Sequence, residues 1–585
     1  MYKWNLDLIC KADEWQKKYD ELDSKISLMK EKVNDFLGDI DSFLEFLTNY
    51  IDINMRIEIV YCYPRRNLDL NLKDEHYKEM LDKALDLYQE ILKLGSIFEN
   101  KLISNLLVVN EYLKDERLYV HRRYINLIIR KGSHGIASDS KAEYERKIQD
   151  IKSSYQALFN NGFSIENLNL SDRSVDLNRF NYNDLILDSN QKNREIIFNA
   201  YTSEYEKYNK VLADLYIDKL KNDIDLSKKE GYSSLLLKKL FELEIDDNIV
   251  ESLIRKVNSK LDIMHSYTRL KKQALGLSKL HFYDSTLSFC SIPKITYSIT
   301  EAIMLIKNSL SVLGNEYVNL IDKMFNEGWI DVFPIENKRS SSFTCISYVG
   351  VPYVLVNFDG SINSVRTLAH EIGHAMNVYC SKNKNSFEYF EFSYFLTEIA
   401  SKVNEHLFNH YIINNCKSEE EKIYILNNII SSLGNSLFGQ VMLTEFEHTI
   451  INKIANYEDV DSDVLNDTYL DISKKYNGPD MVYTDNIKYG WSKIQHFIMQ
   501  DSYYLYQYSI GAAIASNISK RIIDREPLIL DKYTKFLSAG NSVSIKEALA
   551  YLDIDLGNGE YIDNAFSVLD DSIKELRKIK RLWYS

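Results

Sequence analysis

The sequence predicts a mostly α-helical protein that contains a small β-sheet. Its 585 residues include only 6 prolines and 20 glycines, so few positions force the chain out of a helix. Long stretches carry apolar residues at three- and four-residue spacing among charged ones, which is the pattern of amphipathic helices. The chain is too long for one simple core, and we expect two or three helical lobes folded onto each other.

Helical patterns dominate the first half of the chain. Successive amphipathic helices are expected from residue 13 to about residue 114, and residues 130–159 contain a Gly/Ser-rich loop followed by another helix. Residues 178–201 resemble a connection into the next helical block, which continues to about Asn326. These changes predict three consecutive regions, an N-terminal helical lobe, a helical connecting region and a large C-terminal domain, at 1–115, 116–185 and 186–585.

The character of the chain changes between residues 332 and 364. This stretch is rich in Val, Tyr, Phe and Ser and ends on an Asp-Gly turn signal, so it predicts two short strands. Helices return beyond Gly360, with a loop at residues 474–485 and a final helix within residues 566–584.

Charge and cysteine use indicate an ordinary intracellular protein. The formal net charge is -14, with 71 basic and 85 acidic residues in no long single-sign block, so we expect no nucleic-acid partner. The N-terminus lacks a signal-peptide pattern, and no apolar window is long enough for a membrane span. The six cysteines lie far apart, which indicates reduced thiols and a cytoplasmic location; they are Cys10, Cys62, Cys290, Cys345, Cys380 and Cys416.

The stretch TLAHEIGHAMNVY carries the clearest chemical signal. On a helix, His370 and His374 lie one turn apart on the same face and can bind one metal ion, with Glu371 projecting beside them. A carboxylate in that place can take a proton from a water that the metal activates. The pattern arises by chance in about one such chain in seventy. The preceding strand, the turn and a possible N-cap at Ser361 or Asn363 favour the metal site over chance.

A catalytic zinc needs a third protein ligand and an open position for water. The best candidate is Glu398, beside an apolar helical stripe, although a solvated helix carboxylate is the alternative reading. Glu405 returns to nearly the same helix face and could support the site from behind the ligands. His406 and His410 form a second pair at the same spacing but lack an adjacent base, so we interpret them as helix-packing histidines. Gly373 permits the close approach of another backbone.

These motifs together resemble the thimet-oligopeptidase and oligoendopeptidase F family of zinc metallopeptidases, and the oligoendopeptidase F branch in particular. The resemblance covers nearly the whole chain, from the WNLDLICKADEWQKKYDEL opening onwards, and its specific motifs lie in the C-terminal half. They occur in family order at residues 337–358, 367–377, 395–405, 441–448, 476–483 and 491–511.

The resemblance implies one zinc ion per chain, held by His370, His374 and Glu398. Glu371 would be the general base and would then carry the proton to the leaving amine. The region 186–585 would be the zinc metallopeptidase catalytic domain. Family members place the site deep in a substrate channel that helical lobes enclose, which would admit short peptides and exclude folded proteins.

The resemblance also implies hydrogen-bond donors for the developing oxyanion. They are His496 and tyrosines among Tyr503, Tyr504, Tyr506 and Tyr508. We predict Tyr503 and Tyr506, with Tyr508 in reserve, and expect at least two of the four tyrosines to be packing residues. The strand PYVLVNF lies beside the helix of His370 and His374, which we call the metal helix. It suggests that an extended peptide adds to a sheet edge.

The sequence departs from the family pattern at two places. Asn377 stands where relatives often have histidine, and residues 337–341 read NKRSS where the family often has GKRSG. Neither change removes a proposed ligand or base. They leave open the loop geometry near the strand and the surroundings of the metal helix.

The sequence therefore predicts a cytoplasmic zinc-dependent metalloendopeptidase that hydrolyses internal bonds of short oligopeptides. One alternative is a metallocarboxypeptidase with the same ligand set, and another is a non-catalytic scaffold that binds peptides. No membrane or nucleic-acid partner is expected. The sequence does not determine the oligomeric state, although a monomer is compatible with it.

Overall fold

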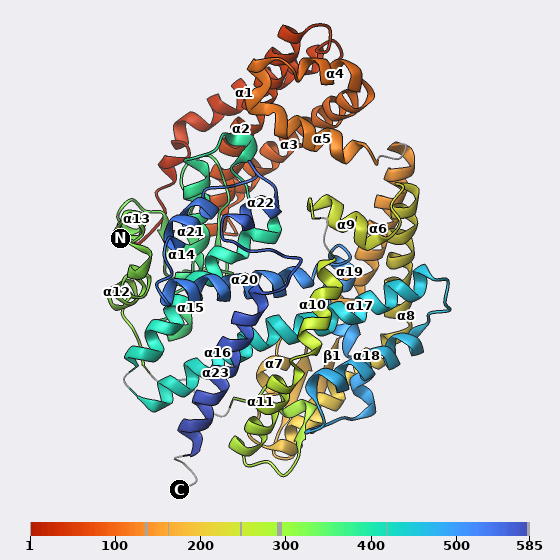
Figure 1. Cartoon of the computed structure of the whole chain (residues 1–585), viewed down its shortest axis with the longest axis vertical. Coiled ribbons are helices and arrows are strands. Elements are labelled where there is room, and N and C mark those ends of the chain that lie inside the picture. Colours follow the sequence, from red (N-terminus) through yellow and green to blue (C-terminus); the bar gives the residue numbers. More distant parts are fainter. Residues whose placement is uncertain are drawn as a thin grey trace. The chain divides into compact units, whose positions relative to one another are not determined.

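The structure, a computed structural model, describes residues 2–134, 138–161, 163–245, 248–288, 295–416 and 418–581 (Figure 1). Helices account for most of these residues and the strands are short, so the predicted mostly α class is confirmed. The chain packs into two compact units, each assembled from separate segments. Unit 1 comprises Met1–Gly135, Lys294–Asn414 and Ile518–Ile554, and unit 2 comprises Ile136–Pro293, Asn415–Asn517 and Asp555–Ser585. The predicted regions 1–115, 116–185 and 186–585 are continuous stretches of sequence, whereas each compact unit combines separate segments; these regions stay a prediction.

Unit 1 begins with a helical bundle and continues into a small sheet and the helices around it. Its helices are α1 (Trp15–Lys32), α2 (Ile40–Leu70), α3 (Glu75–Ser104), α4 (Leu106–Tyr112), α5 (Arg122–Gly132), α12 (Ile299–Leu310), α13 (Asn315–Asn326), α14 (Ile362–Lys382), α15 (Tyr394–Asn415), α21 (Ile529–Leu537) and α22 (Ile545–Ala550). Its strands are β4 (Ile330–Asp331), β5 (Phe343–Thr344) and β6 (Val354–Leu355).

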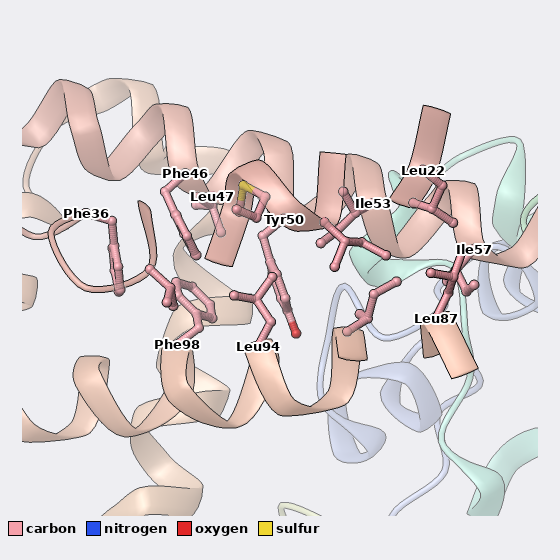
Figure 2. Close-up of a cluster of buried hydrophobic side chains, with 14 of the residues drawn as sticks. Leu22, Phe36, Phe46, Leu47, Tyr50, Ile53, Ile57, Leu87, Leu94 and Phe98 are labelled. Atoms are coloured by element: carbon pink, nitrogen blue, oxygen red, sulfur yellow. The ribbon is translucent and has the colours of Figure 1, made fainter. Parts of the chain in front are cut away.

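The core of the N-terminal bundle consists of stacked aromatic and branched apolar side chains. Figure 2 shows Phe46 and Tyr50 of α2 facing Leu94 and Phe98 of α3. The Phe46 ring centroid lies 4.5 Å from that of Phe36 and 5.5 Å from that of Phe98. Aromatic packing of this kind adds to the hydrophobic burial of each ring. The amphipathic pattern expected for residues 13–114 therefore forms one helical bundle.

The sheet of unit 1 has the order β4-β6-β5, with β4 parallel and β5 antiparallel to β6. Strands β5 and β6 are the two predicted from the sequence, and β4 was not expected. Strand β6 lies inside PYVLVNF and is the central strand of the sheet, so its own edges are already paired; the expected addition of a peptide to a sheet edge stays a prediction. The two edge strands of this sheet are β4 and β5.

Unit 2 is also mainly helical. Its helices are α6 (Ser138–Asn161), α7 (Tyr182–Leu185), α8 (Gln191–Lys229), α9 (Leu235–Glu242), α10 (Ile249–Asn258), α11 (Leu261–Ala274), α16 (Glu419–Gly434), α17 (Gln440–Ala455), α18 (Ser462–Asn477), α19 (His496–Met499) and α23 (Tyr561–Arg581). Helix α20 (Tyr506–Ile523) begins in this unit, and a π-helical turn at Asn435–Gly439 precedes α17. Its strands are β1 (Ser164–Asn169), β2 (Ser174–Asn178), β3 (Leu280–His281) and β7 (Met481–Val482).

Several smaller predictions can be checked against these elements. The final helix is α23, and the loop predicted at residues 474–485 contains strand β7, which pairs in parallel with β3. No described helix is long and apolar enough to cross a membrane. Cys10, Cys62, Cys345 and Cys380 are not joined in disulfides, and Cys290 lies outside the described residues.

The predicted close approach at Gly373 is confirmed. A Cβ atom built on Gly373 of α14 would lie 2.6 Å from Ser401 Cα and 2.7 Å from the Ala400 carbonyl oxygen, both in the backbone of α15. Real Cβ atoms do not approach backbone atoms this closely, so only glycine lets these two helices touch.

We expect Gly373→Ala to lower stability by about 1–3 kcal/mol, because the added methyl group must push two backbones apart. Gly511→Ala is the matched control: Gly511 also lies in a helix, but its added Cβ would meet no atom within 4 Å. The control should leave stability unchanged or raise it by up to about 1 kcal/mol. Thermal unfolding midpoints measure both effects, and equal midpoints for the two variants would contradict the close-packing argument.

Candidate metal centre and active site

Helix α14 carries the two histidines, and its start is well defined. The Ser361 hydroxyl accepts the backbone N–H of Ser364 and so caps the helix N-terminus, which confirms one of the two predicted caps. Inside the helix, the Nε2 atoms of His370 and His374 lie 3.2 Å apart. The helical spacing therefore brings the two imidazoles to one point, as predicted.

Glu398 of α15 completes a set of three groups. Its carboxylate oxygens lie 3.7 Å from Nε2 of His370 and 3.8 Å from Nε2 of His374. Ligand atoms of all three residues fall within 4.8 Å of one another, and no other such group of three or more His, Cys, Asp or Glu residues is found in the described parts of the chain. Two imidazoles and a carboxylate are a donor set that suits zinc and leave room for a fourth ligand.

The electrostatics of the two helices favour a bound cation. Burial, together with the neighbouring His370, lowers the pKa of His374 to about 4, so this imidazole is neutral at neutral pH and has a lone pair for a metal. Oε1 of Glu405 lies 2.9 Å from Nδ1 of His370, on the side of the ring away from Nε2. A carboxylate at that place orients the ring, so the position of Glu405 fits the supporting role expected from the sequence, which stays a prediction.

Glu371 of α14 is held in place by a residue of the neighbouring strand β5. The Thr344 hydroxyl of β5 lies 2.8 Å from Oε2 of Glu371 and 2.9 Å from its backbone carbonyl oxygen. Burial raises the pKa of Glu371 above its ordinary value, although His370 and the Thr344 hydroxyl oppose the shift. A carboxylate with a raised pKa is well suited to accept a proton near neutral pH.

A buried polar contact joins α13, α15 and α14 behind the ligands. The side-chain amide of Asn404, which is fully buried, donates to the carbonyl oxygen of Ala369, the residue before His370. The Tyr317 hydroxyl donates in turn to Asn404 Oδ1 at 2.8 Å. Sequence reasoning missed Thr344 and Asn404. A signal for Asn404 was available, because it falls on the apolar stripe of α15, four residues after Ala400.

The two departures from the family pattern have structural explanations. The Asn377 side chain is buried and donates to the carbonyl oxygen of Leu537, so it joins the helix of the two histidines to α21. Asn337 adopts a positive φ of 62°, a conformation that asparagine tolerates better than most residues and that suits the glycine often found there. Lys338 and Arg339 then form ion pairs with Asp331 and Asp69.

The predicted oxyanion donors lie in unit 2, where the structure separates them into two groups. The first is the His496 cluster, which consists of His496, Tyr504 and Tyr508. The His496 ring stacks on Tyr504 with centroids 6.0 Å apart and meets Tyr508 edge-on at 6.2 Å. All three side chains are half-buried, and the Tyr508 hydroxyl lies 3.4 Å from that of Tyr504. Burial lowers the pKa of His496, which favours the neutral imidazole with one N–H donor.

The second group contains the two tyrosines that the sequence favoured. Tyr503 is only 2% exposed, and its hydroxyl lies 3.0 Å from Nδ1 of His448. Tyr506 is 0% exposed. Their predicted catalytic roles stay predictions, but their burial makes them less suited to contact a substrate than Tyr504 and Tyr508. His406 of α15 is half-buried with its pKa lowered to about 4 by burial, and the exposed His410 lies 3.1 Å from the Asn414 amide, which fits the packing interpretation.

Comparison with known proteins gives the family. The model of peptidase family M3 matches residues 185–568, which is more than half of the chain. The chain belongs to peptidase family M3. Oligopeptidase PepF of Bacillus subtilis is 27% identical over 98% of this chain and 87% of its own length. An oligoendopeptidase F homolog of Borreliella burgdorferi is 28% identical over 99% of this chain and 98% of its own length.

Solved structures agree with this M3 assignment. A structure from Chlamydophila abortus has a TM-score of 0.92 and 25% identity, covering 99% of this chain and 98% of the other. Oligoendopeptidase-F from Enterococcus faecium shares the fold, with a TM-score of 0.74 at 24% identity over 97% of this chain and 99% of the other. The comparisons confirm the family and the enzyme class expected from the sequence, a metalloendopeptidase.

We expect Glu405→Gln to weaken metal binding by about 10- to 100-fold, because the His370 ring loses the negative charge that orients it. Glu388→Gln is the matched control, since Oε1 of Glu388 lies 2.7 Å from Nδ1 of His121, which is not part of the donor set. Competition with a chromogenic chelator measures the metal affinity of both variants. The assigned place of Glu405 is wrong if both variants bind metal as tightly as the wild type.

Proposed function

We propose that this M3 peptidase is a zinc-dependent endopeptidase that hydrolyses internal bonds of short oligopeptides. The observation that carries the proposal is the convergence of His370, His374 and Glu398, with Glu371 held beside them by Thr344. The names of the relatives support the substrate class, since they are described as oligopeptidases and oligoendopeptidases. The reduced thiols are in keeping with a cytoplasmic enzyme.

The proposed ligands are His370, His374 and Glu398, one zinc ion per chain. When bound, zinc supplies Lewis-acid chemistry that makes a water molecule a better nucleophile near neutral pH. Glu371 accepts a proton from this water as its oxygen attacks the carbonyl carbon of the scissile bond. Glu371 then delivers that proton to the amine nitrogen as the C–N bond breaks. The raised pKa of Glu371 serves both transfers, because the group must take up and release the proton in one cycle.

The carbonyl oxygen gains negative charge in the same step and needs hydrogen-bond donors. We propose the His496 cluster for this role, with Tyr504 and Tyr508 in place of the predicted Tyr503 and Tyr506. The half-exposed positions of these rings and the neutral state of His496 support the choice. Phenol and imidazole donors that are already oriented stabilise an oxyanion more than water does.

Strand β5 is the proposed docking edge for the substrate backbone. It is one of the two edge strands of the three-stranded sheet, and its Thr344 contacts Glu371. An extended peptide that pairs with β5 would form main-chain hydrogen bonds and place few demands on sequence. A broad sequence preference among extended, unfolded peptide segments follows.

The decisive experiment compares Glu371→Gln with Glu398→Ala. We expect Glu371→Gln to keep its metal and to lose about 10²- to 10⁴-fold in kcat, because only the proton acceptor is removed. Glu398→Ala should lose the metal itself. Metal content and cleavage of a quenched fluorescent peptide measure the two effects, and a fully active Glu371→Gln enzyme would contradict the mechanism.

The substrate peptide in this experiment has an amidated C-terminus. Because a carboxypeptidase needs a free terminal carboxylate, cleavage inside the amidated peptide distinguishes the endopeptidase from that alternative. Mass spectrometry of the products locates the bond that is cut. Removal of single residues only from unblocked peptides would favour the metallocarboxypeptidase.

The choice of donors is tested by phenylalanine substitutions. We expect Tyr504→Phe and Tyr508→Phe each to lower kcat by about 10²- to 10³-fold with a smaller change in KM, because each removes a donor to the transition state. Tyr506→Phe, at a fully buried position, should change kcat little. A large loss in Tyr506→Phe with none in the other two would restore the original choice.

A further inference from the structure

The residue before Tyr504 has an unusual backbone. Tyr503 adopts a φ of 61°, in the left-handed region that a bulky residue rarely occupies because it is strained there. It lies in the turn between α19 and α20, so in the sequence it separates His496 from Tyr504 and Tyr508, the other members of the His496 cluster. A strained residue persists only where its surroundings hold it, so the contacts around Tyr503 identify what fixes this turn.

Glu447 of α17 binds the backbone of this turn. Its Oε2 accepts the backbone N–H of Tyr503 at 3.1 Å, and its side chain is nearly inaccessible to solvent. Burial raises the pKa of Glu447 to about 7, although the nearby Lys219 opposes the shift. A buried carboxylate is costly, and an apolar residue of similar size would often be as stable. The Glu447 carboxylate is instead placed to fix the backbone conformation of Tyr503.

Three further contacts hold the same turn. The Tyr503 hydroxyl lies 3.0 Å from Nδ1 of His448, the residue after Glu447. The hydroxyl of Ser502 accepts from Nζ of Lys219 at 2.9 Å and donates to Asp223 at 2.7 Å. Lys219, Ser502 and Tyr503 are each about 2% exposed or less. Residues 502 and 503 are therefore bound by buried polar groups from two helices, α8 and α17.

From this arrangement we infer that Glu447 and Tyr503 are positioning residues for the reaction. Glu447 holds Tyr503 in the left-handed conformation, and that conformation directs the next side chain, Tyr504, onto the His496 ring. Tyr503 itself contributes its backbone N–H and its buried ring instead of a donor to the substrate. The inference rests on the proposed role of Tyr504 as an oxyanion donor.

A double-mutant cycle on kcat tests this inference. We expect Glu447→Leu to lower kcat by about 10- to 100-fold with KM nearly unchanged, because a misplaced donor weakens only the transition state. In a Tyr504→Phe background the same substitution should cause no further loss, since its effect passes through the Tyr504 hydroxyl. Losses that simply multiply in the double variant, or an unchanged kcat in Glu447→Leu, would overturn the inference.

Two comparison variants separate positioning from general damage. Glu447→Gln keeps an oxygen that can accept the Tyr503 N–H, so kcat should stay near the wild-type value. Glu445→Leu is the matched control on the same helix, because Glu445 binds Lys475 and Tyr476 and not the turn. It should leave kcat unchanged. An equal loss of kcat in Glu445→Leu and Glu447→Leu would overturn the inference.

The failure of the inference and that of the proposed function can be distinguished. A wild-type kcat in Tyr504→Phe would remove the donor role and the inference with it, whereas a slow Tyr504→Phe with a multiplicative cycle would remove the inference alone. If Glu447→Leu does not fold, Ser502→Ala takes its place in the cycle. It removes the hydroxyl bound by Lys219 and Asp223, and its loss in kcat should likewise vanish in the Tyr504→Phe background.

Discussion

The contact between α14 and α15 at Gly373 sets the geometry on which the candidate metal centre depends. Gly373 lies between His370 and His374 in sequence, and the backbone it meets, at Ala400 and Ser401, follows Glu398 by less than one turn. The contact point thus lies in the middle of the three proposed ligands. Side-chain rotamers adjust the ligand atoms by small amounts, but the distance between the helices is fixed by the absence of a Cβ atom.

Buried polar groups hold the backbone in place at both the candidate metal centre and the His496 cluster. In unit 1, Asn404 and Tyr317 connect a third helix to the backbone of the metal helix. In unit 2, Glu447 and Lys219 hold the turn beside the His496 cluster. Each of these groups gives up hydration, which apolar packing would not require. Their directional hydrogen bonds fix conformations that apolar side chains of similar volume would leave free.

Local patterns in the sequence predicted much of the fold and the convergence of the candidate ligands His370 and His374. The HExxH spacing, the Ser361 cap and the amphipathic bundle each follow from interactions within a few residues. Strands of two residues, such as β4, and the polar hairpin β1-β2 carry too little alternation to be recognised. The prediction of Tyr503 and Tyr506 came from the resemblance to the family, which does not reveal that Tyr503 is left-handed and buried while Tyr504 is half-buried. The position of β6 at the sheet centre is likewise a long-range property.

The discontinuous make-up of unit 1 has a consequence for how the protein is made. The N-terminal bundle draws its core from Cys10 to Ile128 and can assemble as soon as those residues leave the ribosome. The metal helix cannot complete its packing so early, because Asn377 needs the carbonyl group of Leu537. The last segment of unit 1 runs from Ile518 to Ile554, so the helices that carry His370, His374 and Glu398 keep part of their packing surface uncovered until that segment has been made. The nascent chain therefore depends on late, long-range contacts to complete the packing of the candidate metal centre.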